Sequence, residues 1–138
     1  MRPRPLLFAV LTLAVALAAC SASAEWTPLP AGAEPPAACA RADADGVIEI
    51  SADQLRFSAP CMVAPADQDF VVRFTNNESP PHNVAIYSDR AKGTTYLDGE
   101  IITGPDRTID YTVAALAAGE YYFDCTVHPD MKGALYVR

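Results

Sequence analysis

Residues 121–133 read YYFDCTVHPDMKG. This stretch holds a thiol, an imidazole and a thioether, those of Cys125, His128 and Met131, at Cys-x-x-His-x-x-Met spacing. In the strand that leads into it, alternation places Phe123 and Cys125 on one face and Asp124 on the other, which points the thiol inward. A short loop between two antiparallel strands can fold the three side chains around one point. The stretch therefore predicts a metal-binding hairpin.

A second imidazole is available from one position only, because the chain has two histidines. The other is His82, in the segment PPHNVAIY at residues 80–87. Two imidazoles, a thiolate and a weak thioether are the donors of a blue copper site, since soft sulfur suits cuprous ion and imidazole suits both redox states. We therefore expect one copper ion held by His82, Cys125, His128 and Met131.

Two other arrangements of the site remain open at this stage. Zinc would have to recruit Asp130 or water, because methionine is a poor zinc ligand. Met62 is a second candidate for the axial position, but it lies in an apolar, strand-like stretch and is expected to pack in the core.

The rest of the domain consists of short runs of β-branched and aromatic residues separated by turn-forming residues. This pattern predicts an all-β sandwich of about seven or eight strands. The candidate strands are 47–50, 54–57, 70–75, 82–87, 107–113, 120–126 and 134–137. The segment 114–119 is rich in alanine and is interpreted as a short helical turn.

The motifs Pro-His-Asn-Val (residues 81–84) and Cys-x-x-His-x-x-Met (residues 125–131) resemble those of the cupredoxin family, in particular its plastocyanin-like and amicyanin-like members. The resemblance covers residues 46–138 and implies a Greek-key β-sandwich. It also implies His82, Cys125 and His128 as strong equatorial ligands and Met131 as the axial ligand.

By the same resemblance, Asn83 ties the two ligand-bearing loops together by hydrogen bonds and so fixes the ligand geometry. His128 is expected to expose one ring edge through an apolar patch and to act as the electron port. The implied function is electron transfer with redox partner proteins, such as a c-type cytochrome or a copper oxidase, by a protein that is a monomer.

Two other classes of function compete with electron transfer. An extracytoplasmic protein that binds copper and delivers it to a copper oxidase is the alternative, although the three methionines form no cluster. An enzyme is not expected, because a further copper centre would need several additional histidines and no hydrolase or phosphate-binding motif is present.

The N-terminus predicts export. Arg2 and Arg4 precede an apolar run over residues 6–19, the pattern of a signal peptide comprising residues 1–19. Residues 17–20 read LAAC and resemble a bacterial lipobox, which makes Cys20 a lipidated residue on the extracytoplasmic face of a membrane. Cleavage after Ala24 is the alternative and would release a soluble periplasmic or secreted protein.

Residues 20–45 are rich in alanine and proline and are interpreted as a tether to the domain at residues 46–138. Loss of residues 1–19 removes two of the ten basic residues and none of the 17 acidic ones, which leaves a net charge of -9. Such a charge makes nucleic acid an improbable partner.

In an oxidising compartment each of the four cysteines needs a separate assignment. If Cys20 carries lipid and Cys125 carries metal, Cys39 and Cys61 remain as a disulfide pair worth about 3 kcal/mol. The alternative is a disulfide between Cys125 and one of these two.

Overall fold

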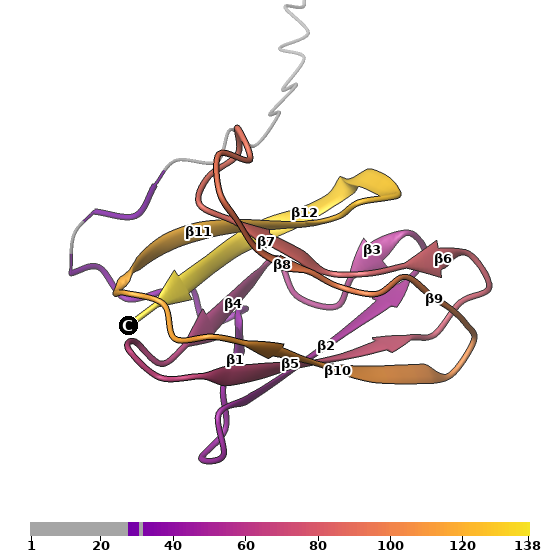
Figure 1. The fold of residues 1–138 in the computed structure, drawn as a ribbon, viewed down its shortest axis with the longest axis horizontal. Coiled ribbons are helices and arrows are strands. Elements are labelled where there is room, and N and C mark those ends of the chain that lie inside the picture. Colours follow the sequence, from indigo (N-terminus) through magenta and orange to yellow (C-terminus); the bar gives the residue numbers. More distant parts are fainter. Residues whose placement is uncertain (1–27, 31) are drawn as a thin grey trace, which may run out of the picture.

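Two β-sheets face each other in the computed structural model, which describes residues 28–30 and 32–138 (Figure 1). The expected signal peptide (residues 1–19) and the expected lipidated Cys20 lie outside the described residues. Within the described part of the chain, no helix is long and apolar enough to cross a bilayer.

The larger sheet has six strands and carries the hairpin with the Cys-x-x-His-x-x-Met motif. In spatial order they are β1 (Ala40–Arg41), β4 (Cys61–Ala64), β12 (His128–Val137), β11 (Gly119–Cys125), β7 (Ala85–Tyr87) and β8 (Thr95–Asp98). Strands β11 and β12 are antiparallel neighbours, whereas β12 pairs with β4 in parallel.

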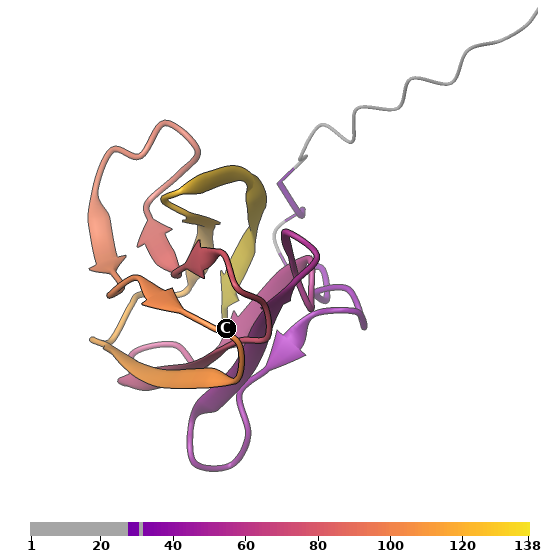
Figure 2. The same cartoon turned by 90° about the vertical axis from the view of Figure 1, so that its right-hand side faces the viewer.

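The second sheet has four strands and forms the opposite layer. Its order is β10 (Arg107–Val113), β5 (Phe70–Asn76), β2 (Val47–Asp53) and β3 (Arg56–Phe57). A two-stranded ladder of β6 (Pro81–His82) and β9 (Ile102–Thr103) lies at one end of the sandwich, which is turned toward the viewer in Figure 2.

The core lies between the two layers. Alternation decides which side chains enter it, since Phe70, Val72 and Phe74 of β5 are fully buried while the residues between them are partly exposed. Phe123 and Cys125 of β11 belong to the same cluster, which confirms that the thiol points inward. Met62 also packs in this cluster.

The all-β sandwich is confirmed, and the described residues contain more strands than expected because several are only two residues long. Segment 82–87 is broken between β6 and β7, and residues 54 and 55 form a turn between β2 and β3 rather than strand. The helical turn predicted at residues 114–119 was wrong, since β11 already begins at Gly119 and the residues before it form no helix.

The disulfide between Cys39 and Cys61 is present, with a Cα separation of 4.5 Å. Cys125 is free and buried, which makes the alternative pairing of Cys125 wrong. The first strand begins at Ala40, before the expected domain boundary at Gly46. A disulfide of this kind fits an oxidising compartment outside the cytoplasm.

Candidate metal centre

Three strand ends, from two separate segments of the chain, bring the predicted ligands to one end of the sandwich. His82 ends β6, Cys125 ends β11 and His128 begins β12. The last two face each other in the β11–β12 register, where an irregularity at residues 124 and 125 interrupts the ladder. Met131 follows on β12 and packs in the same apolar cluster as Cys125.

The ligand atoms surround a common point. Cys125 Sγ lies 3.7 Å from Nδ1 of His82 and 3.8 Å from Nδ1 of His128, and the two nitrogens are 3.1 Å apart. A circle through three atoms with these separations has a radius of about 2.1 Å, which matches the lengths of about 2.0–2.3 Å known for metal bonds to imidazole and thiolate. The residues therefore fit one metal ion in a nearly planar triangle of strong donors.

The ligands differ in solvent exposure, and this difference decides which of them can be reached from the protein surface. His82 and Cys125 have no exposed surface and Met131 has 2%. His128 is partly exposed. One imidazole thus reaches from the buried site to the protein surface, as expected for His128.

Glu78 fixes the ring of His82. Its Oε1 atom lies 2.9 Å from His82 Nε2, so the neutral imidazole donates from Nε2 and keeps the lone pair of Nδ1 for a metal. Burial lowers the pKa of His82, the nearby His128 lowers it further, and the Glu78 hydrogen bond acts in the opposite direction. The balance favours the neutral, metal-binding form.

Asn76 shapes the loop that carries Glu78 and leads to His82. Its buried amide nitrogen donates to the carbonyl oxygens of Pro80 and Ile102 at 2.8 and 3.0 Å, and its Oδ1 accepts from Glu78 N at 3.0 Å. Neither Asn76 nor Glu78 was singled out from the sequence, although an acidic residue four positions before a ligand histidine is a usable signal.

Asn83 links the two ligand loops as the family resemblance implies. Its Oδ1 accepts from the amide and the hydroxyl of Thr126, next to Cys125, at 2.9 and 3.0 Å. Its amide nitrogen donates to the carbonyl of Gly99 at 2.8 Å. A Cβ at residue 99 would lie 2.5 Å from the Val84 carbonyl oxygen, so this close approach requires glycine.

An ion pair supports β11 from the side opposite the ligands. Lys92 Nζ lies 2.6 Å from Oδ2 of Asp124, whose side chain is 1% exposed. The same ammonium lies 4.8 Å from the centre of the Tyr87 ring. Asp124 is the residue before Cys125, so this contact holds the backbone that presents the thiolate.

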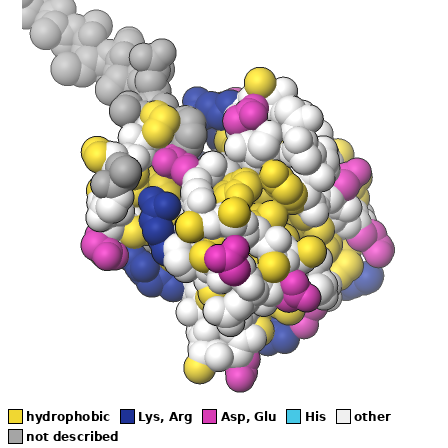
Figure 3. Space-filling view, turned by 60° about the vertical axis from the view of Figure 1, so that its left-hand side comes forward, with side chains coloured by type: hydrophobic (Ala, Val, Ile, Leu, Met, Phe, Trp, Pro, Cys, Tyr) yellow, Lys and Arg dark blue, Asp and Glu magenta, His cyan; other side chains and the backbone are white. Residues whose placement is uncertain are grey.

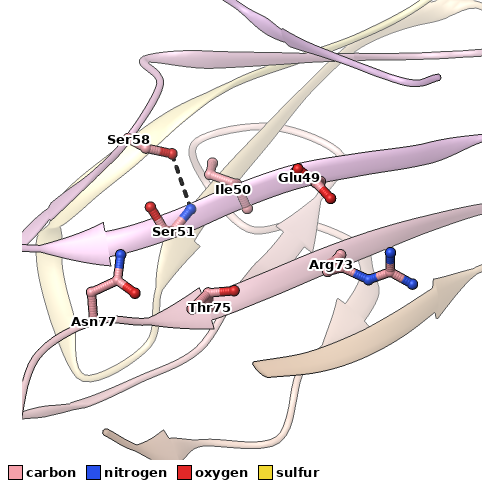
Figure 4. A pocket seen from close by; sticks show the side chains of 7 residues that line it. All are labelled: Glu49, Ile50, Ser51, Ser58, Arg73, Thr75 and Asn77. Atoms are coloured by element: carbon pink, nitrogen blue, oxygen red, sulfur yellow. Dashed lines mark hydrogen bonds between the residues drawn. The ribbon is translucent and has the colours of Figure 1, made fainter. Parts of the chain in front are cut away.

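A separate hollow lies on the outer face of the four-stranded sheet, over β2 and β5 (Figure 4). It is lined by Glu49, Ile50, Ser51, Ser58, Arg73, Thr75 and Asn77. None of these residues belongs to the predicted ligand set, so the hollow is distinct from the candidate metal centre.

The family model described as a cupredoxin-like domain matches residues 8–137. The chain belongs to this family. Amicyanin of Paracoccus versutus is 30% identical over 127 residues, which cover 91% of each chain. Reduced auracyanin of Roseiflexus castenholzii shares the fold with a TM-score of 0.61 at 23% identity, over 70% of this chain and 99% of that chain. Auracyanin A of Chloroflexus aurantiacus, a "blue" copper protein, has a TM-score of 0.59 at 22% identity, over 67% of this cupredoxin and 98% of its own chain.

Membership of this family decides between the two metals that the sequence left open. His82, Cys125, His128 and Met131 are the type 1 copper site of this cupredoxin. The fold, the donor set and the family together make the chain a type 1 copper electron-transfer protein and not an enzyme.

Proposed function

We propose that this cupredoxin is an exported electron carrier, tethered to a membrane by lipid on Cys20, that exchanges single electrons with redox partner proteins through His128. The observation that carries the proposal is the burial pattern of the ligands. Nitrogen, nitrogen and sulfur surround one point in the protein interior, and among these three residues only His128 reaches the surface.

The protein's part in the reaction is to hold the ligands still. Copper supplies the redox chemistry by cycling between its cuprous and cupric states. The bonds of Glu78 to His82 and of Asn83 to Thr126 fix the donor atoms before the ion binds. Fixed ligands reduce the rearrangement that accompanies each electron, which favours rapid transfer.

The surface at this end of the molecule suits transient docking. Val127 is 41% exposed beside His128, and Ile101 is 47% exposed beside Ile102, the cross-strand partner of His82. Exposed apolar side chains around a partly exposed ligand allow a partner to approach and exclude water. A c-type cytochrome or a copper oxidase is a partner of suitable redox chemistry.

Export and tethering rest on the sequence of residues 1–20, and the disulfide supports export. The signal peptide delivers the chain to an oxidising compartment, where the bond between Cys39 and Cys61 can persist. Delivery of copper to another protein is less well supported, since a cargo ion would be held by His82 and Cys125 with no exposed surface.

The test of electron carriage compares the copper-loaded protein with the Cys125→Ser variant. We expect an intense thiolate-to-copper absorption band and a reversible voltammetric couple in the first and no such band in the second. A colourless wild-type copper complex, or one without a reversible couple, would contradict electron carriage.

The test of tethering is metabolic labelling with a fatty acid. We expect label on the wild-type protein and none on the Cys20→Ser variant. An unlabelled wild-type protein recovered in the soluble fraction would contradict the lipid anchor and favour cleavage after Ala24.

A further inference from the structure

Residues 28–30 and 32–41 form a strap that lies against the six-stranded sheet. The amide of Leu29 donates to Oε2 of Glu120 at 3.0 Å, and the Leu29 side chain packs beside a cluster that contains Ala134 and Tyr136. Arg41 donates to the carbonyl of Pro35 at 3.0 Å, which closes the strap on itself. The sequence predicts a tether over residues 20–45, and the described residues of that segment up to Arg41 pack on the domain.

A covalent bond and a strand fasten the end of the strap. Cys39 is bonded to Cys61 of β4, and β1 pairs in parallel with the same strand. The amide of Ala42 then donates to the Val63 carbonyl at 3.0 Å. While the disulfide is intact, Cys39 and the strap residues that follow it therefore stay on the sheet.

The start of the strap meets the sandwich at the end away from copper. Leu29 contacts Glu120 near the start of β11, whereas Cys125 ends the same strand five residues later, about 17 Å along it. The strap lies at the left of Figure 1, and Figure 3, which brings this side forward, shows no histidine. We call the end at Glu120 the strap pole and the end at His82 and His128 the copper pole.

Covalent geometry limits how far an anchored domain can move. Pro28 lies eight positions after Cys20, and eight extended residues span at most about 29 Å. If residues 20–45 were a free tether, more than twice that reach would be available, and the domain could present any side to the membrane.

We propose that the strap and its disulfide set the orientation of the anchored protein, with the strap pole toward the bilayer and the copper pole away from it. This inference rests on the proposed anchor at Cys20. The orientation fits a redox partner whose docking surface projects from the membrane or is free in the compartment, rather than one level with the lipid headgroups.

The experiment attaches the copper-loaded chain, beginning at residue 20, to vesicles by a maleimide lipid. Cys20 offers the reactive thiol, because Cys39 and Cys61 are bonded to each other and Cys125 is buried. This coupling does not depend on lipidation in the cell, so the orientation is tested even if the natural anchor is disproved. The readout is quenching of a headgroup dye by the visible absorption band of oxidised copper, which depends steeply on distance.

The matched control is the Cys20→Ser/Arg107→Cys double variant, anchored at the copper pole. Arg107 is exposed and pairs with Asn76, which bonds the loop leading to His82. We expect quenching to be severalfold weaker with the anchor at residue 20 than at residue 107. Equal quenching from the two anchors would overturn the proposed orientation.

The Cys39→Ser/Cys61→Ser variant tests the strap directly. We expect hydrogen exchange in residues 28–41 to rise by about tenfold or more, and quenching from the Cys20 anchor to increase toward that of the control. The blue band reports whether this variant has folded. If this variant does not fold, the comparison of the two anchor positions tests the proposed orientation by itself. Unchanged exchange in a folded variant would refute the role of the disulfide.

Discussion

Glu78 and His82 form a hydrogen bond of 2.9 Å that leaves Nδ1 of His82 directed at Cys125. Carboxylates that orient a ligand imidazole typically contribute 10–100-fold to metal affinity, and we expect the Glu78→Ala variant to bind copper about 10–100-fold more weakly. Competition against a copper chelator measures this. Glu100→Ala is the control, because Glu100 is exposed at the same end of the molecule. Equal affinities of the two variants would contradict the role of Glu78.

Asn83 is fully buried and bonds both Thr126 and Gly99. Asn83→Ala leaves the buried Gly99 carbonyl and the amide and hydroxyl of Thr126 without these bonds, and we expect the free energy of unfolding of the apoprotein to fall by about 2–3 kcal/mol. Urea denaturation measures the loss. The exposed Asn77 provides the control, and Asn77→Ala should change stability by less than about 0.5 kcal/mol. A comparable loss in both variants would show that the linking bonds are unimportant.

Lys92 neutralises the buried carboxylate of Asp124. Lys92→Met leaves that charge buried without its partner. Because the lysine side chain is 42% exposed and water can partly replace it, we expect a loss of about 1–3 kcal/mol in unfolding free energy, below that of a fully buried pair.

The Lys92→Met/Asp124→Asn variant should recover part of this stability, since it removes the charge as well. Lys132→Met is the control, because Lys132 lies 3.8 Å from Asp130 and both side chains are exposed. Thermal or urea unfolding distinguishes these variants. A double variant less stable than Lys92→Met would refute the assignment.

The pKa of His82 is lowered by burial and then by His128. Its unfolded value is 6.5, so as pH falls below about 6.5 the unfolded apoprotein takes up a proton that the folded one does not. The unfolding free energy of the apoprotein should therefore decrease toward acid, by at most about 1.4 kcal/mol per pH unit from this group. Urea unfolding between pH 7.5 and 5.5 measures how the unfolding free energy changes with pH. This change should be smaller for the His82→Gln variant than for the wild-type apoprotein, and an equal change would contradict the prediction.

The hairpin ligands could be predicted because their geometry is local. Cys125, His128 and Met131 lie within seven residues. A short turn between paired strands brings them together without contacts from distant parts of the chain. Composition limited the fourth ligand to His82, since it is the only other histidine. The disulfide followed from counting cysteines, and the inward thiol followed from strand alternation.

The supports of the site were decided by tertiary structure. Lys92 and Asp124 are 32 positions apart, and Leu29 and Glu120 are 91 apart, so no local period brings them together. Each contact exists because of the order in which strands join the six-stranded sheet. Charged or proline-rich loops have the same composition whether they are solvated or packed, and only the completed sheet provides the surface on which they fold.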